Sequence, residues 1–149
     1  MKVVIGSDHA GFKLKEKLKV FFDKNKIDYE DVGPYKYDKN DDYPHYSVKV
    51  AEKVVKLKCK GVIIGKSGQG EAIASNKVKG IRAMVYYGKD KKIIKLSREH
   101  NDSNILSLGA GFLSEKEASE AVKLFLSTKF SNHSRHKRRL NEISKFEKR

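Results

Sequence analysis

The sequence is poor in cysteine, tryptophan and proline, and it lacks long apolar runs. Among its 149 residues there is one cysteine, no tryptophan and two prolines. The single Cys59 excludes a disulfide framework or a cysteine zinc set, so we expect a protein of the reducing cytoplasm. No stretch approaches the roughly 18 apolar residues that a membrane helix requires. Asp8 and His9 also interrupt the N-terminal apolar run too early for a signal peptide.

Positive charge is abundant, with 33 Lys and Arg against 19 Asp and Glu and a formal net charge of +14. Residues 129–149 carry eight Lys or Arg and two Glu, and the remaining excess is spread along the chain. Many lysines alternate with acidic residues at helical spacing, as in "KLKEKLKVFFDKNK" at 13–26. No aromatic cluster lies within a basic patch, as base stacking would require. We therefore interpret the charge as solvated surface and disfavour nucleic acid as a partner, with a polyanion-binding face as the alternative.

Short β-branched or apolar runs alternate with amphipathic segments along the chain. Ser114 and Glu117 form a capping box at the start of one such segment. The alternation predicts an α/β fold with a doubly wound parallel sheet, in one domain spanning 1–149. The predicted strands are 2–6, 27–32, 61–65, 81–87 and 105–109. The predicted helices are one with apolar residues between 12 and 22, and others at 46–57, 70–78, 90–98, 114–126 and from 136 onward.

Four polar segments flank these strands. They are "SDHAG" at 7–11, "DDYPHY" at 41–46, "GKSGQGE" at 65–71 and "SREHND" at 97–102. In sheets of this kind, ligands bind beyond the carboxyl ends of the strands. We therefore expect the four segments to meet at that edge and to form one composite site.

The glycine-rich segment at 65–71 is not a nucleotide-binding motif. A P-loop would require glycine where Lys60 stands, and a dinucleotide fingerprint would require glycine where Ile73 stands. What remains is a strand-to-helix turn whose backbone N–H groups can bind negative charge. If that charge appears only during a reaction, the turn is an oxyanion hole and Glu71 is the base that generates the charge. Alternatively, Glu71 only interacts favourably with the helix dipole.

Five blocks of the sequence resemble type B ribose-5-phosphate isomerases, a family that includes the galactose-6-phosphate isomerase subunits. The blocks occur in the family's order over essentially the whole chain. They are "GSDHAGFKLK" at 6–15, "DYPHY" at 42–46, "GKSGQGEAIASNKVKGIRA" at 65–83, "SREHNDSNILSLG" at 97–109 and "RHKRR" at 135–139.

The resemblance implies a Rossmann-like, three-layer α/β/α domain with a central five-stranded parallel sheet and a basic C-terminal helix. It implies homodimers, paired into tetramers in some members, with sites at the dimer interface. The implied reaction interconverts ribose 5-phosphate and ribulose 5-phosphate without a metal or an organic cofactor.

The implied chemistry needs a group that opens the sugar ring and a base that moves a proton between two carbons. His100 matches the family's ring-opening histidine, and histidine titrates near neutral pH; without the resemblance, it would be interpreted as a surface residue at a helix end. Glu71 matches the base of one branch of the family, whereas the other branch has a cysteine at the position of Gly65. Cys59 precedes the predicted strand 61–65 and so lies at the end of that strand away from the expected site. The resemblance implies that a cis-enediolate is held by Ser67 and by three neighbours, Gly68, Gln69 and Gly70.

Six further residues match substrate-binding positions of the family. They are Asp8, His9, Tyr43, Asn101, Arg135 and Arg139. The first two match contacts to sugar hydroxyls and to the phosphate end, and the next two match positioning groups. The two arginines are four residues apart, so they share a helix face and can clamp a phosphate. Asp42 is a weaker candidate, and His136 could assist the arginines.

Two positions depart from the family pattern. Gly111 stands where many members carry a phosphate-binding arginine that acts from the partner chain, and Lys66 stands where small residues are common. A nearby lysine could replace the arginine. The sequence also leaves the substrate open, since a six-carbon sugar phosphate such as allose or galactose 6-phosphate is an alternative. A binder of sugar phosphates or polyanions without catalysis is a further alternative.

Overall fold

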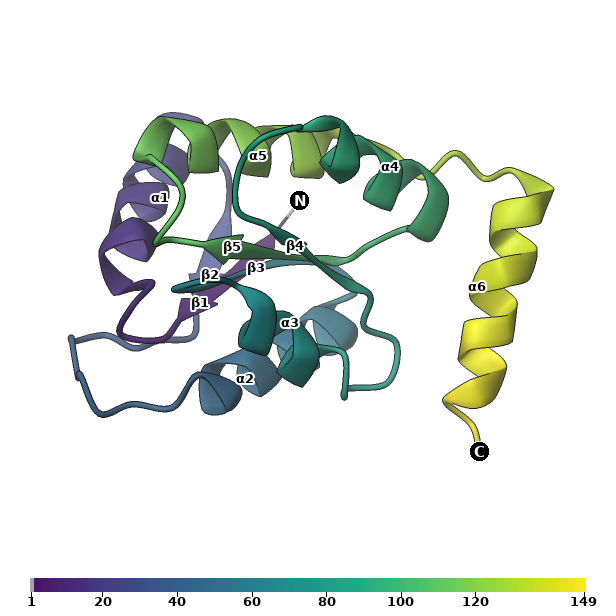
Figure 1. The fold of residues 1–149 in the computed structure, drawn as a ribbon, viewed down its shortest axis with the longest axis horizontal. Helices are drawn as coiled ribbons and strands as arrows, with labels where there is room; N and C mark the ends of the chain where they lie inside the picture. The colour runs from purple at the N-terminus through teal and green to yellow at the C-terminus, as the bar shows by residue number, and fades with distance from the viewer. Residues whose placement is uncertain (1) are drawn as a thin grey trace.

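The chain folds around a five-stranded sheet that is covered by helices on both faces (Figure 1). In this computed structural model, residues 2–149 are described. The strand order is β2-β1-β3-β5-β4, and every neighbouring pair is parallel. This confirms the predicted Rossmann-like α/β architecture. The strands are β1 (Val3–Ser7), β2 (Tyr29–Asp31), β3 (Lys60–Gly65), β4 (Ala83–Tyr86) and β5 (Ile105–Gly109).

Six helices connect and extend the strands. They are α1 (Phe12–Lys24), α2 (Tyr43–Leu57), α3 (Gln69–Ser75), α4 (Lys92–Asn101), α5 (Glu115–Ser127) and α6 (Ser134–Phe146). Helix α2 begins three residues earlier than predicted, because Pro44 is compatible with the first turn of a helix. Helix α4 continues three residues beyond its predicted end and stops where Asp102 adopts a left-handed conformation. His100 therefore lies within a helix instead of a loop.

The sheet is buried on both faces because successive side chains of a strand point to opposite sides. Along β3, Val62 and Ile64 belong to the apolar cluster formed with α1, α4 and α5. Ile63, between them, belongs to the cluster formed with α2. Figure 1 shows α1, α4 and α5 on one side of the sheet and α2 and α3 on the other. This double packing fixes the carboxyl ends of the central strands β1 and β3 next to each other.

The segment after β1 lies directly on the end of β3. The backbone N–H of Asp8 donates to the carbonyl of Ile64 at 3.2 Å. A Cβ atom at Gly11 would lie 2.2 Å from the Ile64 carbonyl oxygen, so only glycine permits this approach. The predicted proximity of segments 7–11 and 65–71 thus has a packing cause.

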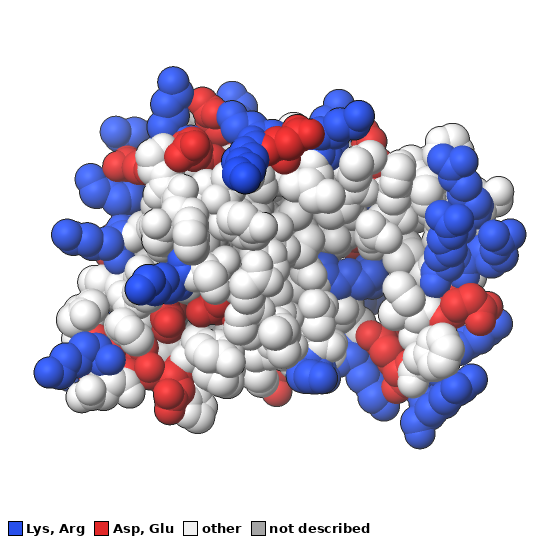
Figure 2. Space-filling view, viewed as in Figure 1, with Lys and Arg blue, Asp and Glu red and all other residues white. Residues whose placement is uncertain are grey.

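Helix α6 stands apart from the sheet and contacts the rest of the chain near α4 (Figure 1). On the face shown in Figure 2, Lys and Arg gather along α6 and around the α1 end, and an area with few charged side chains lies between them. On this face, the distribution supports the interpretation of the charge as solvated surface and disfavours a continuous nucleic-acid-binding surface. Among residues 2–149, no helix has both the length and the apolar character needed to cross a membrane.

A buried lysine anchors the start of the β2–α2 connection. Lys15 is fully buried, and its Nζ lies 2.7 Å from Asp31 Oδ2 and donates to the Pro34 carbonyl at 2.8 Å. The other oxygen of Asp31 accepts the backbone N–H of Gly33 at 2.9 Å. These bonds compensate for the burial of the ammonium group, and they hold residues 31–34 against α1.

Replacing Lys15 with methionine keeps the length of the side chain but removes its charge. Lys15→Met leaves the Pro34 carbonyl without its donor and leaves Asp31 with Lys19, at 3.0 Å, as its remaining cation, so we expect it to lower the free energy of unfolding by about 2 kcal/mol. Urea denaturation measures this change. Lys13→Met, at an exposed position of the same helix, is the control and should change the free energy by less than about 0.5 kcal/mol. Equal effects of the two substitutions would show that the anchor contributes nothing.

Candidate active site

The glycine-rich turn between β3 and α3 presents free backbone amides. Gly68 has a φ of +77°, a conformation that favours glycine. The hydroxyl of Ser107, on β5, donates to the Gly68 carbonyl at 2.6 Å and so fixes the orientation of this peptide. Within residues 2–149, the backbone N–H groups of Gly68 and Gly70 donate to no protein acceptor. The turn can therefore bind a negatively charged oxygen.

Glu71 places its carboxylate against the bare Cα of Gly65. A Cβ atom at Gly65 would lie 1.7 Å from Glu71 Oε1, so the carboxylate occupies the space of a missing side chain. Glu71 is 4% exposed. Burial raises its pKa above the usual range of a glutamate, and the nearby Asp8 carboxylate adds to this effect. A carboxyl group whose pKa is shifted toward neutrality can exchange protons at physiological pH.

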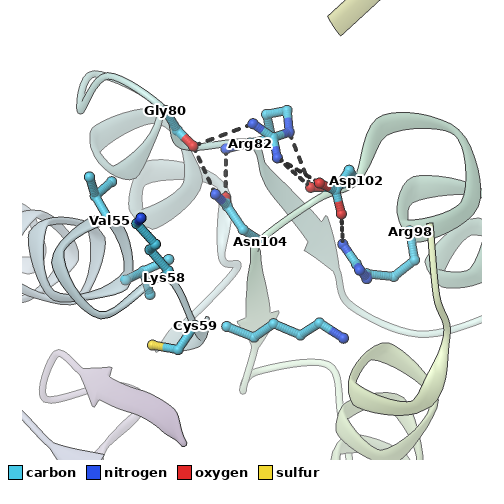
Figure 3. Close-up of a pocket in the computed structure, with 10 residues that line it drawn as sticks. Val55, Lys58, Cys59, Gly80, Arg82, Arg98, Asp102 and Asn104 are labelled. Atoms are coloured by element: carbon cyan, nitrogen blue, oxygen red, sulfur yellow. Dashed lines mark hydrogen bonds and ion pairs between the residues drawn. The ribbon is translucent and has the colours of Figure 1, made fainter. Parts of the chain in front are cut away.

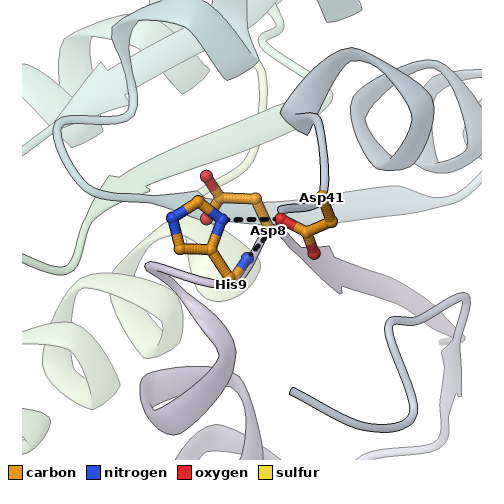
Figure 4. A group of neighbouring side chains, drawn as sticks. All are labelled: Asp8, His9 and Asp41. Atoms are coloured by element: carbon orange, nitrogen blue, oxygen red, sulfur yellow. Dashed lines mark hydrogen bonds and ion pairs between the residues drawn. The ribbon is translucent and has the colours of Figure 1, made fainter. Parts of the chain in front are cut away.

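Asp8 lies near this carboxylate and forms a second cluster with His9 and Asp41 (Figure 4). Asp8 is buried and accepts the backbone N–H of Gly11 at 3.0 Å. Burial raises the pKa of Asp8, and the hydrogen bond from Gly11 opposes that shift. The Nδ1 atom of His9 lies 2.7 Å from Asp41 Oδ1, and this hydrogen bond raises the pKa of His9.

The Asp8–His9–Asp41 cluster is also the group of the described residues whose donor atoms could surround a metal ion, since the three atoms lie within 4.8 Å of one another. The Nδ1 atom of His9 is, however, engaged by the carboxylate of Asp41. A metal ion would have to replace that bond.

Tyr43 completes the arrangement from the start of α2. A Cβ atom at Gly70 would lie 2.7 Å from Tyr43 Cζ, so the tyrosine ring packs on the glycine turn. The hydroxyl of Ser67 accepts the backbone N–H of Gln69 at 3.3 Å. The structure thus brings eight of the predicted site residues to the carboxyl edge of the sheet. They are Asp8, His9, Tyr43, Ser67, Gly68, Gln69, Gly70 and Glu71.

The expectation that segment 97–102 joins the same edge within one chain is wrong. This segment precedes β5, and parallel strands share their direction, so it lies at the amino edge of the sheet. The two edges are separated by the length of a five-residue strand, roughly 16 Å. In Figure 1 the end of α4 lies beside the start of α6, opposite the α1 side to which β1 leads. The chain therefore separates His100, Asn101, Arg135 and Arg139 from Glu71.

A second, cationic cluster surrounds His100. Its ring stacks on that of His136, with centroids 4.2 Å apart and an angle of 14° between the planes. His136 is buried, and burial lowers its pKa, as do the nearby His100, Arg135 and Arg139. The Nε group of Arg135 donates to His136 Nε2 at 3.4 Å. His136 therefore links α6 to the end of α4.

The two departures from the family pattern are neighbours. The backbone N–H of Gly111 donates to the Lys66 carbonyl at 2.9 Å. A Cβ atom at Gly111 would lie 3.2 Å from Lys66 Cγ, so the stem of the exposed lysine covers the bare glycine. A cation is thus present next to the position where many members carry arginine.

A pocket of about 420 Å³ opens at the amino edge of the sheet (Figure 3), and none of the predicted site residues lines it. Its arginines are engaged by the end of α4. Arg82 donates to the carbonyls of Asn101 and Asp102, and Arg98 donates to Asp102 Oδ1 at 2.8 Å. Cys59 also lines the pocket, and burial raises the pKa of its thiol, which disfavours a nucleophilic role. We interpret these hydrogen bonds as caps of the C-terminal end of α4, so the pocket has a structural role.

Sequence reasoning missed two residues of the site. The prediction includes Ser107 only as part of the strand 105–109, although a polar residue between Leu106 and Leu108 is a signal of a further role. The sequence predicts Asp42 as a weaker candidate and not its neighbour Asp41, but Asp42 has no side-chain capping bond at the start of α2. No local pattern distinguishes the two aspartates, because the contact with His9 spans 32 residues.

Comparison with known proteins identifies the family of the chain. A sequence model of the Ribose/Galactose Isomerase family matches residues 3–143. Ribose-5-phosphate isomerase B of Mycolicibacterium paratuberculosis is 34% identical over 99% of this chain and 92% of its own length. The Clostridium thermocellum ribose-5-phosphate isomerase B structure has a TM-score of 0.93, with 39% identity over 99% of this chain and 98% of its own.

The Mycoplasma genitalium ribose-5-phosphate isomerase B, solved with bound ribulose 5-phosphate, has a TM-score of 0.92 at 35% identity, over 99% of this chain and 96% of its own. These matches extend over the elements that carry both clusters. The chain belongs to the type B ribose-5-phosphate isomerase family.

The raised pKa of Glu71 predicts a pH-dependent effect on stability. The folded protein holds the Glu71 proton more tightly than the unfolded chain, so stability falls as pH rises through the interval between the two pKa values. Glu71→Gln has no such proton to lose. The variant should therefore unfold at higher urea concentration than the wild type at pH 8, and this difference should shrink as pH falls toward 4. A difference that stayed constant with pH would contradict the burial argument.

Proposed function

We propose that the protein interconverts ribose 5-phosphate and ribulose 5-phosphate, with Glu71 as the base that moves the proton. The observation that carries this proposal is the buried Glu71 carboxylate, lodged against Gly65 beside the free amides of the glycine turn. The names of its relatives, and the ribulose 5-phosphate bound to the Mycoplasma genitalium enzyme, support the substrate class. We further propose that residues 1–149 act as one isomerase domain in the cytoplasm.

The reaction starts with ring opening, in which His100 exchanges protons with the ring oxygen and the C1 hydroxyl. In the open aldose, the hydrogen on C2 is acidic because it is adjacent to the C1 carbonyl. Glu71 removes this proton, and the electron pair of the broken C–H bond forms the C1–C2 double bond of a cis-enediolate. The same carboxyl returns the proton to C1, the proton of the C2 hydroxyl passes to O1, and the carbonyl forms at C2. The hydrogen and the carbonyl exchange positions within one molecule, so neither a metal nor an organic cofactor enters the proposal.

The glycine turn stabilises the enediolate oxygen. Backbone N–H groups of Gly68 and Gly70 are free to donate, and Ser107 holds the turn in place. Gln69 and the hydroxyl of Ser67 contribute further polar groups at this point. Preorganised donors of this kind stabilise charge that develops in the transition state, and removing one typically costs about 3 kcal/mol.

The working unit in this proposal is a homodimer with two sites at its interface. Glu71 and His100 lie at opposite edges of one chain, and a twofold axis can bring Glu71 of one protomer to the His100 of the other. Helix α6 stands apart from its own sheet, with Ile143 44% and Phe146 62% exposed. These exposed apolar side chains support a subunit contact. Pairing of two such dimers would give a tetramer with the same sites.

The phosphate end of the substrate faces cations in this arrangement. Arg135 and Arg139 are exposed on α6 and free to form bidentate contacts with phosphate oxygens. Lys66, beside Gly111, supplies the cation that the usual arginine would provide. Tyr43 and Asn101 position the sugar, and Asp8 binds its hydroxyls.

A six-carbon sugar phosphate stays the alternative substrate, because the matching family model covers galactose isomerases as well. The ribose 5-phosphate isomerases among the relatives favour the five-carbon substrate. Comparing the turnover of ribose 5-phosphate with that of allose 6-phosphate separates the two.

The role of Glu71 predicts a specific loss of turnover. Glu71→Gln keeps the size of the side chain but cannot accept a proton, so kcat for ribose 5-phosphate should fall about 10³-fold. KM should change little, because binding does not need the base. Glu52→Gln, an exposed position on α2, is the control and should leave kcat unchanged. A Glu71→Gln protein that keeps near-normal kcat would refute the assignment.

A mixed dimer tests the shared site. Two differently tagged chains, one with Glu71→Gln and the other with His100→Ala, are coexpressed, and the doubly tagged heterodimer is purified. One of its two sites then has both groups intact, so turnover should be about half that of the wild type. Each parental homodimer should be nearly inactive. A heterodimer no more active than its parents would show that the two residues do not act in one shared site.

A further inference from the structure

We infer that Asp41 is a positioning residue for substrate recognition: its carboxylate orients His9 and favours the cationic form of the ring, so that the opposite Nε2–H binds the phosphate of the sugar. The inference rests on the proposed function and deepens it. It assigns a role to a loop residue that makes no contact with the reacting carbons in the mechanism above.

The contact between the two residues has a defined geometry. One oxygen of Asp41, Oδ1, accepts both the backbone N–H of His9 at 2.9 Å and a hydrogen bond from its ring Nδ1 at 2.7 Å. Two bonds to one oxygen fix the ring relative to its own backbone. In Figure 4 the Nδ1 side of the ring faces Asp41, and the other ring nitrogen lies on the far side. The side chain of His9 is 34% exposed, so this nitrogen is accessible to a ligand.

The burial of Asp41 makes the charge of His9 necessary. Its side chain is 7% exposed, and its second oxygen, Oδ2, is buried without a hydrogen-bond partner in the described part of the chain. Over residues 2–149, His9 is the one cationic group recorded within ion-pair distance of Asp41. A buried carboxylate without a cation is strongly unfavourable. The hydrogen bond accordingly raises the pKa of His9, which extends the imidazolium to higher pH.

The other titratable groups near His9 are acidic or phenolic. Asp8 adjoins it, and its charge also favours the cation, while Glu71 lies beyond Asp8. The ring of Tyr37 meets that of His9 edge-on at 6.3 Å between centroids. Tyr46 lies near Asp41, and burial together with that carboxylate raises its pKa. If His9 were neutral, a phosphate near Asp8 and Asp41 would meet their negative charge without this cation to offset it.

The loop that carries Asp41 is held at both ends. Lys15 bonds the Pro34 carbonyl at its start, and helix α2 begins at Tyr43 immediately after it. Asp41 itself donates its backbone N–H to the Asp38 carbonyl at 3.2 Å. The position of the carboxylate is therefore set by the fold, which suits a residue that orients another.

Asp41→Asn tests the inference, because asparagine keeps an oxygen for both N–H groups but removes the charge. The His9 ring is followed by NMR titration, and kinetics with ribose 5-phosphate are measured from pH 6 to pH 9. We expect His9 to titrate at lower pH in the variant than in the wild type. KM should rise about tenfold in the pH range between the two His9 titrations, where the variant has lost the imidazolium that the wild type still has, and much less at pH 6, while kcat changes less than about twofold.

The control is Asp38→Asn, which removes the same charge from the same loop away from His9 and should leave both readouts unchanged. An unshifted His9 titration in Asp41→Asn would overturn the inference, as would a shifted titration with an unchanged KM between the two titrations. Absence of turnover in the wild-type protein would instead overturn the proposed function, and the substrate role of Asp41 with it. The NMR titration still decides in that case whether Asp41 sets the charge of His9.

Discussion

The contact between the carboxylate of Glu71 and the bare Cα of Gly65 is the constraint on which the candidate site depends. It requires glycine at the end of β3 and a turn that brings residue 71 back over that end. The turn requires the left-handed Gly68, and the hydroxyl of Ser107 on the neighbouring strand holds it. Strands β3 and β5 are paired in parallel register through Gly65 and Gly109. The sheet itself therefore sets the distance between the Glu71 carboxylate and the glycine-rich turn.

This arrangement concentrates acidic groups where a negatively charged substrate would bind. Asp8 and Glu71 are buried beside each other, and burial raises the pKa of both. Such a site is unfavourable for stability and useful for proton transfer, a trade-off that is common at active sites. His9, oriented by Asp41, offsets part of the negative charge. The buried Lys15 anchors the loop from which Asp41 approaches.

The sequence predicted the parts of the site that depend on local pattern. The β-branched runs identified the strands, and the glycines at 65–71 identified the turn and the place of Glu71 next to Asp8. The direction of the chain at 97–102 was misjudged: a segment that precedes a strand lies at the edge opposite to one that follows it. The roles of Asp41 and Ser107 could not be predicted, because each acts through a contact with a residue more than 30 positions away.

Because the predicted residues are divided between two edges, the proposed function requires a second protomer. Glu71 lies at one edge, and the stacked rings of His100 and His136 lie at the other, so one chain presents two complementary half-sites.

The central claim is that Glu71 carries the proton between adjacent carbons, and a crystal structure with bound ribulose 5-phosphate tests it most directly. The account predicts one carboxylate oxygen of Glu71 about 3.5 Å from both C1 and C2 of the sugar. A carboxylate turned away from both carbons in a fully occupied site would contradict it.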